Sequence, residues 1–137
     1  MRYRSVVLAM LLASPANAMI QCIYYDQMIV QAAKVVQIAA PKVGAADANG
    51  YCAVSGQISR VFVGAARVDD WLETSVPCDN VQGIAGPVIW TAGAALAAAK
   101  VIELHLDGAD QIAGYGAGVV LLDVLTDSPM WKPLCGE

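Results

Sequence analysis

Residues 52–78 read CAVSGQISRVFVGAARVDDWLETSVPC, and this stretch indicates the fold class. Its first part, SGQISRVFVG (55–64), is rich in β-branched and aromatic residues. In its second part, DWLETSVPC (70–78), Leu72 begins an alternation of apolar and polar side chains. Both features are typical of β-strands, so the stretch predicts two strands joined by the segment GAARVD.

The residues that follow alternate between strand and helix signals. PVIWT (87–91) has the composition of a short strand, and AGAALAAAK (92–100) that of a short alanine-rich helix. KVIELHLDG (100–108) alternates apolar and polar residues, which predicts a half-buried strand. VVLLDVLT (119–126) is an apolar run of strand length.

The residues that precede the stretch predict a helix over residues 26–40. Apolar side chains recur there at helical spacing: Ile29, Ala33, Val36 and Ala40. Asp26 is a suitable N-cap and Pro41 ends the pattern.

The predicted order is helix, three strands, short helix, two strands. We therefore expect a mainly β protein: a small five-stranded OB-like Greek-key barrel with an N-terminal helix and a short helix between strands 3 and 4. The predicted segments are a signal peptide (1–18), an N-terminal helix and linker (19–50) and the barrel with its C-terminal tail (51–137). The last two form one domain.

The stretches CAVSGQISRVFVG and TSVPC place a cysteine near a valine-rich strand that ends in glycine. In this the chain resembles secreted, disulfide-stapled OB-fold modules of the netrin and tissue-inhibitor type. Those modules usually begin with a cysteine whose backbone enters a protease's metal site. Here Met19, Ile20 and Gln21 would precede Cys22, so that inhibitory device does not transfer to this chain.

The N-terminus predicts export. Arg2 and Arg4 precede a short apolar run, and residues 16–18 (Ala-Asn-Ala) form a cleavage site for signal peptidase. The run is too short to cross a hydrocarbon core of about 30 Å, and later apolar stretches are interrupted by glycine or charged residues. We expect a soluble periplasmic or secreted protein, cleaved after Ala18, without membrane insertion.

Four cysteines fit an exported protein, in which disulfides are the default. If the first two strands form a hairpin that turns near residues 65–66, Cys52 and Cys78 lie almost opposite each other. This predicts a Cys52–Cys78 bond and leaves Cys22 to pair with Cys135. The other two pairings of four cysteines remain open at this point.

Charge excludes one class of partner. The chain has eight Lys and Arg residues and twelve Asp and Glu residues, and removal of Arg2 and Arg4 leaves six bases. An acidic protein repels nucleic acid and anionic membrane surfaces. We therefore expect neither as a partner.

Glu103, His105 and Asp107 are the strongest candidates for a metal site. Alternate residues of a strand share one face at a spacing of about 6 to 7 Å, within reach of one ion. One histidine between two carboxylates is nevertheless a poor zinc set, and alternation alone explains all three residues. We interpret them as the outward, solvated face of the strand and expect no metal.

Catalytic patterns are weak. The chain's one histidine has no G-x-S-x-G serine to activate, and the glycines of GYGAG (114–118) precede strand character, so no dinucleotide cofactor is expected. An alternative role as a small envelope hydrolase would use two acids as general acid and base. Its candidates are the acidic residues Asp69, Asp70, Glu73 and Glu103.

Tryptophan is enriched at interface hot spots, which makes Trp71, Trp90 and Trp131 candidates for binding. At least one is expected in the core, whereas Trp131 lies in a proline-broken tail. We predict Trp71 and Trp131 as the binding residues. The leading hypothesis is a non-enzymatic binding or inhibitory module that recognises a protein or peptidic partner in the cell envelope.

Overall fold

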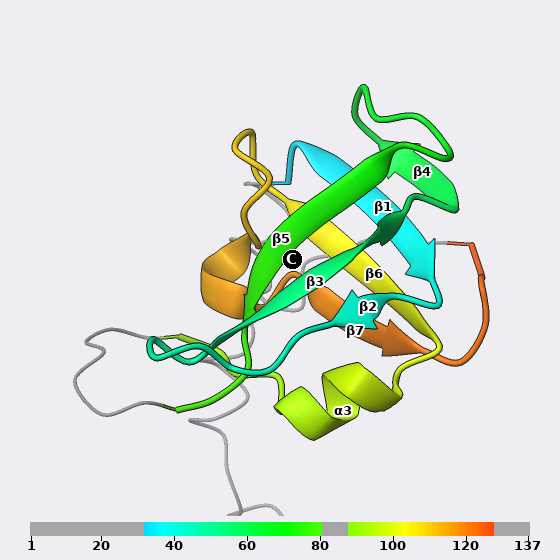
Figure 1. The fold of residues 1–137 in the computed structure, drawn as a ribbon. Helices are drawn as coiled ribbons and strands as arrows, with labels where there is room; N and C mark the ends of the chain where they lie inside the picture. Colours follow the sequence, from blue (N-terminus) through cyan, green and yellow to red (C-terminus); the bar gives the residue numbers. More distant parts are fainter. Residues whose placement is uncertain (1–31, 81–87, 128–137) are drawn as a thin grey trace, which may run out of the picture.

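The computed structural model describes residues 32–80 and 88–127 of the chain. Figure 1 shows two antiparallel sheets that pack face to face. The first sheet has the strand order β4 (Arg60–Val63), β1 (Lys34–Ala39), β6 (Val101–Leu106) and β7 (Val119–Leu122). The protein is thus mainly β, as the sequence predicts.

The second sheet has the strand order β2 (Lys42–Val43), β3 (Tyr51–Gln57) and β5 (Trp71–Pro77). A short helix, α3 (Gly93–Ala98), leads into β6, and a single turn of helix-like structure, η1 (Gly114–Gly116), precedes β7. The predicted helix over 92–100 and the predicted strand over 100–108 are confirmed. The predicted strand over 119–126 is confirmed in its first half, where β7 lies.

One bent hairpin connects the two sheets. Its first arm is β1 followed by β2, its second arm is β3 followed by β4, and the register runs from Val43 opposite Val54 to Val36 opposite Val61. The second arm bends at Ser59, whose hydroxyl accepts a hydrogen bond from the Ala39 N–H at 3.1 Å. Each arm therefore contributes to both sheets.

The hairpin corrects two predictions. Residues 55–64 are not one strand that pairs with residues 70–78, because β3 pairs with β5 while β4 crosses to the other sheet. Residues 88–91 of the predicted strand 87–91 form no strand either. Their backbone bonds go to two different elements: the Ile89 N–H donates to the Tyr115 carbonyl, and the Thr91 N–H to that of Pro77.

The helix predicted over residues 26–40 is wrong at its C-terminal end, where Lys34–Ala39 is strand β1. Residues 26–31 lie outside the described part. Val35, Val36 and Ile38 are β-branched and favour a strand, and β1 gains ladders with both β4 and β6. The helical spacing relied on alanines, which fit either structure.

The core lies between the sheets. Twelve buried side chains form it: Val36, Ile38, Cys52, Val54, Ile58, Leu72, Val76, Cys78, Leu96, Ile102, Leu104 and Leu106. Gly56 lets the sheets approach closely, since a Cβ there would lie 2.6 Å from Cγ2 of Ile38. The core thus fixes the position of β3 and, through it, of β5.

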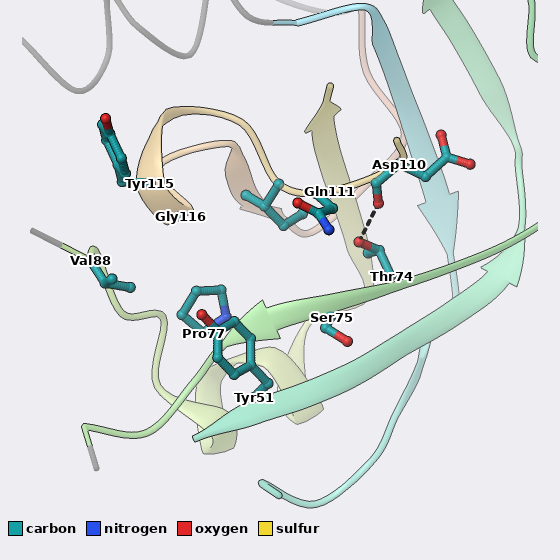
Figure 2. A pocket seen from close by; sticks show the side chains of 10 residues that line it. Tyr51, Thr74, Ser75, Pro77, Val88, Asp110, Gln111, Tyr115 and Gly116 are labelled. Carbon is teal, nitrogen blue, oxygen red and sulfur yellow. Dashed lines mark hydrogen bonds between the residues drawn. The ribbon is translucent and has the colours of Figure 1, made fainter. Parts of the chain in front are cut away.

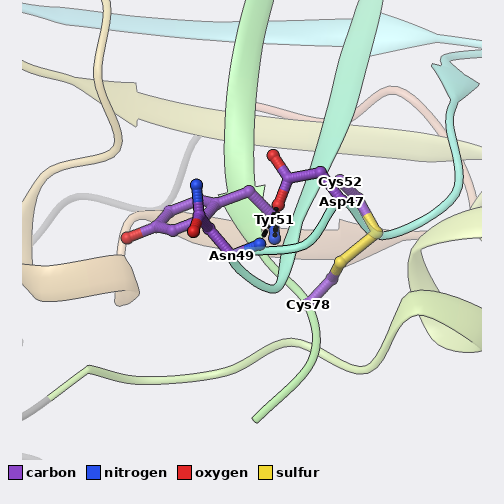
Figure 3. The surroundings of a disulfide bond; sticks show 5 residues. All are labelled: Asp47, Asn49, Tyr51, Cys52 and Cys78. Atoms are coloured by element: carbon purple, nitrogen blue, oxygen red, sulfur yellow. Dashed lines mark hydrogen bonds between the residues drawn. A yellow bond between two sulfur atoms is a disulfide. The ribbon is translucent and has the colours of Figure 1, made fainter. Parts of the chain in front are cut away.

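The predicted Cys52–Cys78 disulfide is confirmed, with 5.8 Å between the two Cα atoms. It joins β3 to the end of β5 beside the turn that precedes β3 (Figure 3). In that turn the Asp47 carboxylate accepts hydrogen bonds from the N–H groups of Asn49 and Tyr51, at 2.8 and 3.0 Å. The second predicted pair, Cys22 with Cys135, lies outside the described residues.

Candidate functional site

The outward face of β3 and β5 carries an aromatic side chain at each end. Trp71 lies opposite Gln57 at one end, and Tyr51 lies opposite Pro77 at the other. At about 3.3 Å per residue the two ends are about 20 Å apart. Trp71 is 59% exposed, and its indole N–H donates to the Glu73 carboxylate at 3.2 Å, which orients the ring on this face.

Small side chains form the floor between these ends. Ala53 lies opposite Ser75, and Ser55 lies opposite Glu73. A shallow depression of about 250 Å³ occupies this floor. We call the outward side chains of β3 and β5 together the binding face: Tyr51, Ala53, Ser55, Gln57, Trp71, Glu73 and Ser75; Pro77, at the end of β5, is buried.

A larger cavity of about 490 Å³ adjoins the binding face (Figure 2). One wall comes from the strands and the other from the loop between β6 and β7. The lining residues are Tyr51, Thr74, Ser75 and Pro77 on the strand side, Asp110, Gln111, Ile112, Tyr115 and Gly116 on the loop side, and Val88. The cavity and the depression share Thr74 and Ser75 in their linings, so the two adjoin each other at β5.

The loop between β6 and β7 is held in place by a bond to β5, by an ion pair with β1 and by bonds within the loop. The Thr74 hydroxyl donates to the backbone carbonyl of Asp110 at 2.8 Å, and the Lys34 ammonium lies 2.7 Å from the Asp110 carboxylate. The side chain of Asp107 accepts hydrogen bonds from the N–H groups of Ala109 and Gln111, at 2.8 and 3.0 Å. Asp107 therefore shapes the loop after β6 and is not part of a strand face, contrary to the prediction.

Tyr115 stands at the rim of the cavity on a left-handed turn. Gly114, Tyr115 and Gly116 have φ angles of 65°, 54° and 99°. A Cβ at Gly116 would lie 2.3 Å from the Ile89 carbonyl oxygen, so the turn requires glycine there. A non-glycine residue in this conformation costs about 1 kcal/mol or more, and such strain clusters at functional sites.

The predicted solvated face of β6 is wrong. Glu103 and His105 are completely buried, because β6 is a central strand that pairs with β1 and β7 and is covered on both faces. The Gln37 side-chain amide donates to one oxygen of Glu103 at 2.9 Å, and Nε2 of His105 lies 2.8 Å from the other. This buried polar cluster of Gln37, Glu103 and His105 lines neither cavity on the β3–β5 side.

The other predicted candidates lie on the binding face, in a turn, or outside the described residues. Trp71 lies on the binding face, whereas Trp131 lies outside the described residues. Asp69 and Asp70 belong to the turn before β5, where the Asp70 carboxylate accepts the Arg67 N–H at 3.1 Å. Within residues 32–80 and 88–127, no three His, Cys, Asp or Glu side chains gather as a metal site.

Sequence reasoning missed Tyr51, Gln111 and Tyr115. The glycines that flank Tyr115 were a usable signal, because they mark a turn with positive φ angles. Tyr51 had a weaker one, its place beside Cys52 at the start of a strand. Gln111 had none, since its position depends on the fold of the whole loop.

No protein-family model, curated protein or solved structure matches this chain. In the described part of the chain, no helix is long and apolar enough to cross a membrane.

Proposed function

We propose that the protein is an exported binding module that recognises a protein or peptidic partner through the binding face and its adjoining cavity. The observation that carries this proposal is that the two adjoin: a cavity of about 490 Å³ and a depression of about 250 Å³ share Thr74 and Ser75, and Trp71 lies exposed on the same face of β5. Pockets of about 300 to 1,000 Å³ that combine aromatic walls with a few polar groups are typical ligand sites.

The side chains suit a peptidic ligand. Tyr51, Tyr115 and Trp71 offer large aromatic surfaces that lose little conformational entropy on binding. Thr74, Ser75 and Gln111 offer hydrogen-bonding groups beside them.

The charges of the face define the partner further. Glu73 and Asp110 are the acids that line the two cavities; the Lys34 ammonium offsets the charge of Asp110, whereas Glu73 bonds to the neutral indole of Trp71 and keeps its charge. A partner segment with a basic side chain is therefore favoured, and a nucleic acid is repelled.

The connection order supports an OB-like interpretation of the fold. A bent hairpin, then β5, α3, β6 and β7 is the order of a five-stranded OB-fold, if the hairpin arms count as strands one and two. OB-folds bind ligands on the face of strands two and three, between the loops that follow strands one and four. On this interpretation β3, β5 and the β6–β7 loop occupy those places.

Export is part of the proposal. Residues 1–18 have the pattern of a signal peptide, and a disulfide such as Cys52–Cys78 persists in oxidising compartments. Mass spectrometry of the protein recovered outside the cytoplasm should give a chain that starts at Met19. A lipid attached to Cys22 would overturn this part.

The hydrolase alternative has less support. It needs two acids that flank a bond, but Glu103 is buried, and the carboxylates of Glu73 and Asp110 already contact Trp71 and Lys34. These contacts favour binding over acid–base chemistry.

Selection from a displayed library of random octapeptides tests the proposal. Enriched peptides should bind the parent protein and lose about tenfold or more affinity with Trp71→Ala or Tyr115→Ala. Val124→Ala, which alters a 66% exposed side chain outside both cavities, is the control and should bind normally. Absence of enrichment, or equal binding by all variants, would overturn the proposal.

A further inference from the structure

Strand β5 lies at the edge of its sheet, and two hydrogen bonds show which of its backbone groups point away from β3. At one end of the β3–β5 ladder the Cys78 N–H donates to the Gly50 carbonyl at 2.9 Å. At the other end the Ile58 N–H donates to the Asp70 carbonyl at 2.8 Å. Because antiparallel pairing alternates, the even-numbered residues of β5 bond to β3, while Glu73 and Ser75 direct their N–H and C=O groups away from it.

Among the described residues, the edge of β5 that points away from β3 is occupied at one end of the strand. There the Pro77 carbonyl accepts the Thr91 N–H at 2.9 Å, which agrees with the alternation. Within the described ranges, no hydrogen bond reaches the outward backbone groups of Glu73 or Ser75. Two consecutive outward positions are therefore open to a new strand.

The cavity lies against this open edge. Thr74 and Ser75 form its wall on the β5 side, and the loop that carries Asp110 and Gln111 faces them (Figure 2). An incoming chain would run along the open groups of Glu73 and Ser75, next to the point where the Thr74 hydroxyl bonds to the Asp110 carbonyl. The carboxylate of Glu73, which bonds to the neutral indole of Trp71, would lie close to its side chains, whereas the charge of Asp110 is offset by Lys34.

The spacing of the open groups suits a polypeptide backbone. Outward positions of a strand repeat every two residues, at about 6.6 to 6.8 Å, and an extended main chain presents its own N–H and C=O groups at the same interval. The edge is also preorganised, since β5 is paired with β3 along its length and tied to it by the Cys52–Cys78 bond. Preorganisation lowers the entropic cost of binding.

We infer that an extended, basic segment of a partner protein adds to β5 as a new strand, bonds to the main chains of Glu73 and Ser75, and places one side chain in the cavity. This inference rests on the proposed function and deepens it. It specifies strand addition as the mode of recognition, with main-chain bonds for affinity and the cavity for selectivity.

The test uses the best library-selected octapeptide, synthesised with single N-methyl groups at each position in turn. N-methylation removes one backbone donor. Strand addition predicts a loss of about tenfold or more at alternate positions and a small loss at those between them.

A matched pair of variants tests the same edge from the protein side. Ser75→Pro removes the outward N–H, and proline is tolerated on edge strands, so the expected loss of affinity is again about tenfold. Ser75→Ala loses the same hydroxyl but keeps the N–H, so it is the reference, and Ser75→Pro should bind about tenfold more weakly than Ser75→Ala. If Ser75→Pro fails to fold by circular dichroism, the N-methyl series decides alone.

The outcomes separate the two proposals. Peptides that bind in a Trp71-dependent way, but show no alternation on N-methylation, would overturn strand addition and leave the proposed function standing. Absence of any binding peptide would overturn both. Concentration-dependent dimers that Ser75→Pro abolishes would assign the edge to a second copy of this chain and overturn the inference.

Discussion

Ser75 of β5 lies directly opposite Ala53 of β3, and these two small side chains form the floor between Trp71 and Tyr51. Larger residues would fit the strands equally well, because both side chains are exposed. Their small size leaves space above the sheet where a ligand can lie.

Ala53→Lys should fill the floor and place a positive charge beside Glu73. Affinity for the selected basic peptides should fall by about tenfold or more. The free energy of unfolding should change by less than about 0.5 kcal/mol, as for other exposed positions. Fluorescence titration and urea denaturation measure the two quantities. Ala65→Lys, in the exposed turn before β5, is the control, and an equal loss of affinity there would point to bulk charge alone.

Gly116→Ala should disrupt the left-handed turn that positions Tyr115. The added Cβ would meet the Ile89 carbonyl oxygen at 2.3 Å, and the φ of 99° is unfavourable for alanine. We expect a loss of stability of about 1 to 3 kcal/mol and weaker peptide binding. Gly108→Ala, which meets nothing within 4 Å, should leave both unchanged. Equal stability of the two variants by thermal unfolding would refute the assigned strain.

Gln37→Ala should destabilise the protein through the buried polar cluster. It removes the donor to Glu103 and the acceptor of the Thr126 N–H, both at part-buried or buried positions. A cost of about 1 to 3 kcal/mol is expected for the groups left unpaired. Gln57→Ala, on the exposed end of β3, should cost less than about 0.5 kcal/mol. A neutral Gln37→Ala in denaturant titration would show that water replaces its bonds.

Loss of the Cys52–Cys78 bond should lower the free energy of unfolding by about 3 to 4 kcal/mol in the chain-entropy treatment, given a separation of 26 residues. The double variant Cys52→Ala, Cys78→Ala isolates this bond from the other two cysteines. Binding should weaken as well, because the bond anchors the end of β5 beside the cavity. An unchanged midpoint in urea would contradict this role.

Local patterns were sufficient for some elements and not for others. The alanine run of α3 and the alternation of β6 predicted both elements, and opposed strands predicted Cys52 with Cys78. The segment of β1 was predicted as helix because Ile29, Ala33, Val36 and Ala40 recur at helical spacing. Its actual state depends on pairing with β4 and β6, which lie about 25 and 65 residues further along the chain.

The face of β6 shows a second limit of sequence reasoning. Alternation correctly separated Ile102, Leu104 and Leu106 from Glu103 and His105, but it does not reveal whether the polar face is covered. A central strand can bury polar residues if they bond to one another, as Glu103 does with Gln37. Gln37 lies 66 residues away in sequence, so no local pattern could have disclosed the pair.

The candidate site was predicted only in part. Trp71 was a candidate because tryptophan is enriched at interface hot spots; the structure shows it 59% exposed on the outward face of β5, and its role in binding stays a prediction. The cavity itself depends on the β6–β7 loop meeting β5 through Thr74 and Asp110. That contact arises from the packing of the two sheets and has no counterpart in local sequence.

Chemical-shift mapping by NMR with a selected basic octapeptide tests the central claim most directly. On titration, the backbone amides of Tyr51, Ala53, Glu73, Ser75 and Gln111 should shift together and saturate with one affinity. The amides around Val124 and along α3 should stay in place. Shifts confined to α3 and β7, with β3, β5 and the β6–β7 loop unmoved, would contradict the assignment of this face as the binding site.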